Sequence, residues 1–101
     1  MIQLKIVSVR RVEKPSVYQF FNSDLGIKEY IRKNFQDTGK LVSISSSVSE
    51  DFTTETKILV FKSQEDYTSF ENNEVLQYQN KLQDRYNNYH RITSTKSISE
   101  I

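Results

Sequence analysis

A short apolar run, Ile58-Leu59-Val60-Phe61, is the segment that most constrains how this chain folds. Successive side chains of a strand point to opposite faces, so Ile58 and Val60 share one face while Leu59 and Phe61 share the other. A strand that is apolar on both faces needs cover on both faces. A chain of 101 residues, which we interpret as one domain spanning residues 1–101, has little material for two covering layers. The run therefore predicts a central strand and raises the question of an assembly partner.

Composition excludes several classes of function. The net charge is +1, and the acidic and basic residues are interspersed, so we predict no nucleic-acid partner and no membrane partner. The absence of cysteine excludes disulfides, thiolate metal sites and a cysteine nucleophile. The N-terminal residues lack the pattern of a signal peptide and no stretch reaches transmembrane length, so a cytoplasmic protein is the expectation. The absence of alanine and the abundance of Ser, Asn, Lys and Ile are typical of AT-rich genomes, such as those of many phages and bacteria.

Four segments have the pattern of β-strands. Ile2, Leu4 and Ile6 alternate with polar residues, and Val7 and Val9 continue on the opposite face, so the first strand is apolar on both sides. The second and last strands alternate apolar with polar residues and are therefore half-solvated. The predicted strands are residues 2–12, 41–49, 52–61 and 90–95, the second and third forming a hairpin and the last extending toward Ile98 and Ile101.

Two segments have the pattern of helices. In the first, Ile27, Ile31 and Phe35 recur at four-residue intervals, with Asn22 or Ser23 as the cap. Thr38-Gly39 provides its left-handed C-terminal exit. The second helix begins at the capping box Ser63-Gln64-Glu65-Asp66 and is interrupted at Asn72-Asn73. Its apolar stripe is predicted at Val75, Tyr78, Gln79, Leu82, Tyr86 and Tyr89.

The element order predicts a βαββαβ ferredoxin-like fold of the α+β class. Right-handed crossovers place two helices on one face of a four-stranded antiparallel sheet, with the first and third strands in the centre. The open face is then expected to present Val7, Val9, Leu59 and Phe61, or their neighbours if the register slips by one. A contiguous apolar band of this kind predicts a homodimer with the two open faces packed together.

The segment from Val60 to Phe70 combines a strand, a polar turn and an aromatic-bearing helix, and the segment from Arg85 to Ile92 leads into the last strand. In these features the chain resembles the dimeric α+β barrel superfamily, which includes antibiotic-biosynthesis-monooxygenase-like proteins. The resemblance implies a dimeric barrel, and in some members cofactor-independent oxidation or haem degradation. Those activities depend on polar residues inside the barrel, and none of them is matched here. Residues 16–22 depart from the compact first half usual in these families.

The candidates for chemistry are few. His90, the only histidine, is a weak candidate for a catalytic proton acceptor, but a half-exposed residue at a helix end is the favoured interpretation. Tyr18, Phe20 and Phe21 are weak candidates for a ligand pocket, although aromatic residues in a connection more often attach it to the core. Arg10 and Arg11, at a strand end, could bind a phosphate or carboxylate, but a solvated strand end is the favoured interpretation. We predict no metal site and no cofactor.

Two functions remain open at this stage. The favoured one is a non-catalytic, dimeric interaction or accessory protein. The alternative is a barrel protein that binds a small ligand or acts as a cofactor-independent monooxygenase. The filling between helices and sheet distinguishes them. Polar or titrating side chains pointing into a cavity there favour the alternative, and a solid apolar filling favours the interaction protein.

Overall fold

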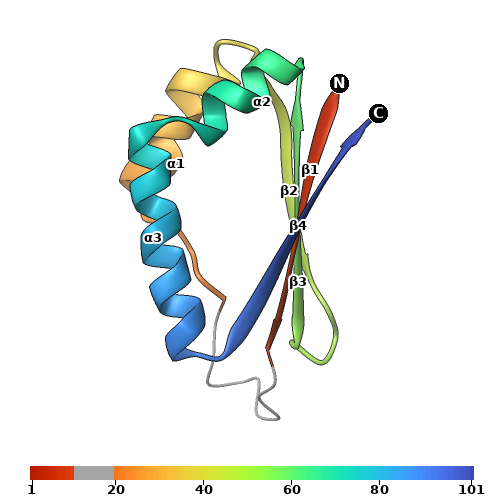
Figure 1. Cartoon of the computed structure of the whole chain (residues 1–101), viewed down its shortest axis with the longest axis vertical. Coiled ribbons are helices and arrows are strands. Elements are labelled where there is room, and N and C mark those ends of the chain that lie inside the picture. Colours follow the sequence, from red (N-terminus) through yellow and green to blue (C-terminus); the bar gives the residue numbers. More distant parts are fainter. Residues whose placement is uncertain (11–19) are drawn as a thin grey trace.

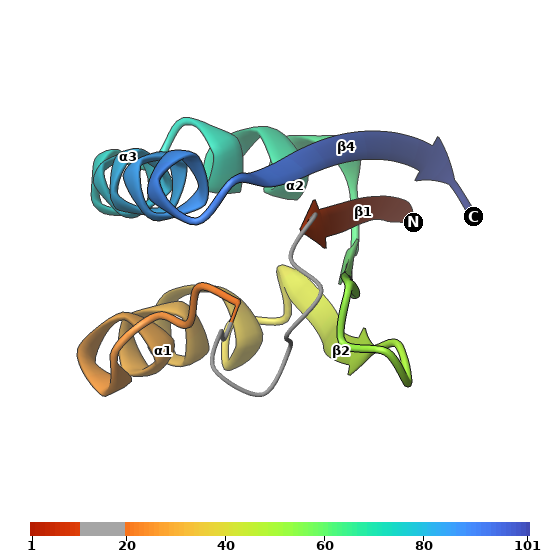
Figure 2. The same cartoon turned by 90° about the horizontal axis from the view of Figure 1, so that it is seen from below.

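The structure is a computed structural model that describes residues 1–10 and 20–101. Within these residues, four strands form one antiparallel sheet in the order β2-β3-β1-β4, and helices cover one of its faces (Figure 1). The elements are β1 (Ile2–Arg10), α1 (Leu25–Ile31), the π-helical turn η2 (Arg32–Gln36), β2 (Leu41–Val48), β3 (Thr54–Phe61), α2 (Gln64–Glu71), α3 (Glu74–Tyr89) and β4 (Ile92–Glu100). Seen along the strands, α3 lies over the β4 side and α1 over the β2 side (Figure 2).

The predicted α+β class and the antiparallel four-stranded sheet are confirmed, with β1 and β3 in the centre as expected. β4 begins at Ile92, two residues later than predicted, and continues past Ile98 to Glu100, in line with the predicted extension toward Ile98 and Ile101. β1 is described as far as Arg10, and the last two residues of the predicted strand lie outside the described residues.

The described residues contain three α-helices where two helices were predicted, because the second predicted helix is divided. The division falls at Asn72-Asn73, as the sequence indicated. The side-chain oxygen of Asn73 accepts hydrogen bonds from the backbone N–H groups of Val75 and Leu76, at 3.0 and 3.2 Å, and so starts α3. Its amide nitrogen donates to the hydroxyl of Tyr30 at 2.8 Å. Asn73 therefore joins the start of α3 to α1.

The helix ends follow local capping rules. Ser63 caps α2 as predicted, because its hydroxyl accepts from the backbone N–H of Asp66 at 3.2 Å. At α1 the predicted cap, Asn22 or Ser23, is wrong. Asp24 caps the helix, and its carboxylate accepts from the N–H of Ile27 at 2.9 Å. A carboxylate is a strong cap because it also complements the helix dipole.

The register between β1 and β3 decides which side chains face the helices. Leu4 lies opposite Leu59, and Ile2 lies opposite Phe61, so these residues share one face. Leu4, Leu59 and Phe61 are only 1%, 8% and 0% exposed, and they belong to the core beneath the helices. The placement of Leu59 and Phe61 on the open face is therefore wrong. The largest apolar side chains bury against the helices, and the β-branched Ile58 takes the open face.

The core occupies one end of the sheet. Its buried members are Leu4, Phe35, Leu41, Leu59, Phe61 and Leu76. The ring of Phe70 meets those of Phe35 and Phe61 edge to face, each at a centroid distance of 5.1 Å. Tyr67 contacts Phe61 in the same geometry at 5.4 Å. Edge-to-face pairs add about 0.5–1.5 kcal/mol each beyond burial, so this aromatic group holds α2 and η2 to the sheet.

Replacement of the fully buried Phe61 by alanine is expected to lower the free energy of unfolding by about 3–5 kcal/mol, because it removes apolar contacts and leaves a cavity. Denaturant unfolding followed by circular dichroism measures the change. Phe52→Ala, at a residue that is 53% exposed, is the matched control and is expected to change stability by no more than about 0.5 kcal/mol. Equal losses in the two variants would contradict this placement of the core.

A carboxylate organises the hairpin between β2 and β3. One oxygen of Asp51 accepts from the hydroxyls of Ser49 and Thr53, at 2.7 and 2.8 Å, and from the backbone N–H of Thr53 at 3.1 Å. These hydrogen bonds, the one from Ser49 first, lower the pKa of Asp51 from 3.8 to about 2. The turn therefore favours the ionised carboxylate.

A carboxyl group whose pKa is lower in the folded state stabilises the fold above its unfolded pKa. For Asp51 that contribution is lost as the pH falls from about 4 toward its folded pKa of about 2. We therefore expect the stability advantage of the unsubstituted chain over Asp51→Ala to shrink across this interval. Unfolding curves of both proteins measured at each pH give the difference. An advantage that is independent of pH would contradict the expectation.

Candidate functional site

The inner face of the sheet changes from apolar to polar along the strands. Residues opposite one another in the register form rows across β3, β1 and β4. In order away from the core, three successive rows are Leu59–Leu4–Ile98, Lys57–Ile6–Lys96 and Glu55–Ser8–Ser94. The change falls at the middle row, where a lysine stands on each side of an isoleucine.

A cavity of about 280 Å³ lies between the sheet and the helices, over the part of the sheet where the apolar row meets the lysine row. Its apolar lining consists of Leu4, Ile6, Ile44 and Leu59 from the sheet, with Ile27, Ile31, Phe70 and Leu76 from the helices. Its polar lining consists of Lys28, Lys57, Lys96, Glu71, Gln79, Asn80, Gln83, Asn22, Ser23 and Ser46. The cavity therefore presents an apolar part and a polar part.

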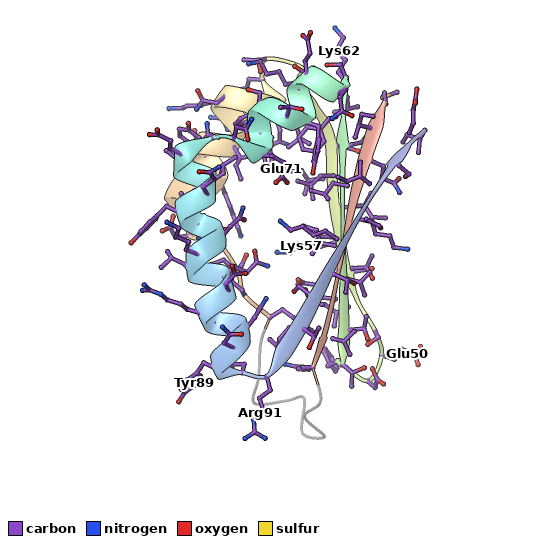
Figure 3. All side chains as sticks on the ribbon, viewed as in Figure 1. Glu50, Lys57, Lys62, Glu71, Tyr89 and Arg91 are labelled. Carbon is purple, nitrogen blue, oxygen red and sulfur yellow. The ribbon has the colours of Figure 1, made fainter. Side chains whose placement is uncertain are left out.

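Lys57 and Lys96 reach the cavity from neighbours of β1 on either side. Lys57 is half-buried, and its ammonium lies 3.7 Å from the carboxylate of Glu55. Lys96 is exposed, in keeping with the edge position of β4. Figure 3 shows Lys57 projecting from the sheet into the space between the layers, with Glu71 projecting from the helices toward it.

The face of α3 toward the sheet is largely made of amides. Leu76 packs in the core at one end of the helix. At the other end, the amide of the buried Asn87 donates to the hydroxyl of Ser94 at 3.1 Å. Gln79 and Gln83 lie between these two anchors, at helical spacing, and line the cavity. The cavity wall is therefore polar where a solid core would be apolar.

The predicted stripe of α3 is displaced by this arrangement. Val75 and Tyr78, expected on the buried side, are 38% and 63% exposed. The helix turns its amides inward because Leu76 and Asn87 provide the contacts that fix its rotation.

Hydrogen bonds organise the end of the cavity beyond the lysine row. The hydroxyls of Ser8 and Ser94 are 2.7 Å apart, and Asn87 donates to Ser94. Arg10, only 3% exposed, donates from Nε to the carbonyl of Phe52 at 2.6 Å. The prediction of a solvated Arg10 is therefore wrong, since hydrogen bonding compensates for its burial.

Glu71 stands on the apolar side of the cavity. Burial raises the pKa of Tyr67, and the nearby charge of Glu71 and a hydrogen bond to that carboxylate raise it further. The raised pKa favours the protonated phenol of Tyr67 next to a carboxylate that lines the cavity.

The residues singled out from the sequence lie elsewhere. His90 follows the last turn of α3, with its ring 4.2 Å from that of Tyr86, and it does not line the cavity. Phe20 lies beneath the guanidinium of Arg10 at 4.8 Å, and Phe21 packs edge-on against Tyr86. Neither phenylalanine lines the cavity. Tyr18 lies outside the described residues.

Val7 and Val9 lie on the open face of the sheet, and Val9 is 43% exposed. Their role in a dimer interface stays a prediction.

Sequence reasoning missed the residues that make the cavity polar. Lys57 lies in phase with Leu59 and Phe61, and this spacing would have placed it on their face. Lys96 lies two residues before Ile98 and four after Ile92, so the three side chains share one face of β4. Ile92 is buried, which identifies that face as the inner one. Gln79 was included in the predicted stripe of α3, whereas Gln83, four residues later, was not, because mainly apolar residues defined the stripe.

Among the described residues, no group of three or more His, Cys, Asp or Glu side chains is placed to hold a metal ion. In the same part of the chain, every helix is too short or too polar to cross a bilayer. Comparison with family models, curated proteins and solved structures finds no match to this chain.

Proposed function

We propose that this chain is a small-ligand-binding protein that holds an amphipathic molecule between its helices and its sheet. The observation that carries the proposal is the lysine row, Lys57–Ile6–Lys96, lying directly beside the row of Leu4 and Leu59 in one cavity. Ligand sites are concave and mostly apolar, with a few placed polar groups. Of the two functions open from the sequence, this lining supports the alternative, in which polar side chains enter a cavity.

The size of the cavity supports the proposal. The volume of about 280 Å³ is close to the lower end of ligand pockets, roughly 300 Å³. The space therefore suits a molecule of metabolite size.

Binding is the function we propose, and the histidine considered as a catalytic group takes no part in it. The lone histidine, His90, packs against Tyr86 at the far end of α3 and does not line the cavity. The lysines and amides that do line it are suited to holding polar groups of a ligand.

Filling the cavity with a bulky side chain tests this function. In Gln83→Trp the indole replaces an amide of the lining and is expected to occupy the space of the ligand. With 1-octanol as an uncharged amphipathic probe, titration followed by ligand-observed NMR is expected to show binding to the unsubstituted chain and at least a tenfold weaker affinity in the variant, about 1.4 kcal/mol.

The matched control is Gln77→Trp, the same change on the exposed side of α3. It is expected to bind 1-octanol as the unsubstituted chain does. Circular dichroism checks that both variants are folded. Binding by Gln83→Trp that is as strong as binding by Gln77→Trp would show that the cavity is not the ligand site.

We also propose that the fold is ferredoxin-like and that two copies pair through their open faces as a dimeric α+β barrel. The strand order β2-β3-β1-β4 supports this topology, because β1 and β3 are central and β2 and β4 are the edge strands. The open face of the central strands carries Val7, Val9, Ile58 and Val60. With Ile58 and Val60 in place of Leu59 and Phe61, this face has apolar side chains on both central strands, interspersed with Gln3, Lys5, Thr54 and Thr56.

A charge introduced among the apolar side chains of the open face is expected to separate the dimer. Val7→Lys puts an ammonium where the two sheets would meet, and its desolvation opposes association. Sedimentation velocity at micromolar concentration is expected to show a dimer for the unsubstituted chain and a monomer for the variant. Gln77→Lys adds the same charge on exposed α3 and is expected to remain dimeric. A monomeric unsubstituted chain would contradict the proposal.

A further inference from the structure

We infer that the ligand of the cavity is a small amphipathic monoanion, a carboxylate whose charged group lies between Lys57 and Lys96 and whose apolar chain lies on Leu4 and Leu59. The inference rests on the proposed ligand-binding function and names the chemistry of that ligand.

The sheet places the two lysines around one position. Lys57 and Lys96 both lie opposite Ile6, from β3 and β4, on the inner face. Neighbouring strands are about 4.8 Å apart, so the two backbones are separated by about 10 Å. Two flexible lysine side chains can reach a common group over that span, above the isoleucine side chain. The row is therefore shaped to hold one small anionic group.

The charges around the cavity leave this row short of negative partners. Glu55 contacts Lys57 at 3.7 Å, a long ion pair. Glu71 lines the same cavity, projects toward Lys57 and also interacts with the phenol of Tyr67. In the described part of the chain, Lys28 and Lys96 enter no ion pair. Three lysines facing two carboxylates leave one positive charge in excess.

An excess of one charge favours a monoanion over a phosphate dianion. The amides of Gln79, Asn80 and Gln83, which line the cavity from α3, can donate further hydrogen bonds to a carboxylate. Charge-assisted hydrogen bonds of this kind are about twice as strong as neutral ones. A carboxylate therefore satisfies both the lysine row and the amide wall.

The apolar half of the cavity determines the chemistry of the rest of the ligand. The row of Leu4 and Leu59 adjoins the lysine row, so an apolar chain attached to the anionic group continues toward the core. At roughly 30 Å³ for each water-sized group, a cavity of about 280 Å³ holds about nine such groups. Octanoate has this size and polarity and is a suitable probe.

The test compares octanoate, 1-octanol and octyl phosphate by titration calorimetry on the full chain. Octanoate is expected to bind about tenfold more tightly than 1-octanol, because the lysine row contributes charge-assisted hydrogen bonds. Lys96→Gln, at an exposed residue, and Lys57→Gln are each expected to remove most of that preference for octanoate over 1-octanol. Lys57→Arg, which keeps the charge beside Glu55, is expected to retain the preference and guards against a folding effect.

The control is Lys5→Gln, which removes the same charge one residue from Ile6 but on the open face of β1. It is expected to retain the full preference for octanoate. Octanoate binding no tighter than 1-octanol, or a preference unchanged in both Lys96→Gln and Lys57→Gln, would overturn the inference and leave the ligand site intact. Tighter binding of octyl phosphate than of octanoate would overturn the inference that the ligand is a monoanion. Failure of all three probes to bind would overturn the proposed function and the inference together.

Discussion

The pairing of β1 with β3 is the constraint on which the rest of the structure depends. With Leu4 opposite Leu59, every second residue of both strands faces the helices. The same alternation that buries Leu59 and Phe61 carries Lys57 onto the inner face. Core and cavity are therefore consequences of one register, and a slip by one residue would expose the core and remove the lysine row together.

The helical layer meets the sheet closely at the core and leaves space beyond it. Leu76 seals the core end of α3, and the hydrogen bonds from Asn87 to Ser94 and from Ser94 to Ser8 attach the other end. The amides between these anchors cannot pack on a lysine row as apolar side chains would, because their polar groups need partners when buried. The space between the layers is thus maintained by contacts at its two ends and by polar groups at its middle.

Local patterns predicted the elements well, since caps and periodicity depend on neighbouring residues. Ser63, Asn73 and the alternation in β1 act within a few residues of themselves. The inward face of β3 was beyond such patterns, because both of its faces are apolar and the choice depends on pairing with β1. The site could not be predicted for the same reason. Lys57 and Lys96 are 39 residues apart in sequence, and they come onto one row only because β3 and β4 both pair with β1.

The lysine row runs against what stability alone would favour. Apolar residues at the positions of Lys57 and Gln83 would fill the cavity and add burial worth roughly 25 cal/mol per Å². The chain instead places like charges on both sides of Ile6 and faces them with amides. Departures from the pattern of a well-packed core concentrate at functional sites, where a ligand supplies the missing contacts. An anion with an apolar chain supplies both kinds of contact that this cavity lacks. Its charge pairs with the lysine row, and its apolar chain packs on the row of Leu4.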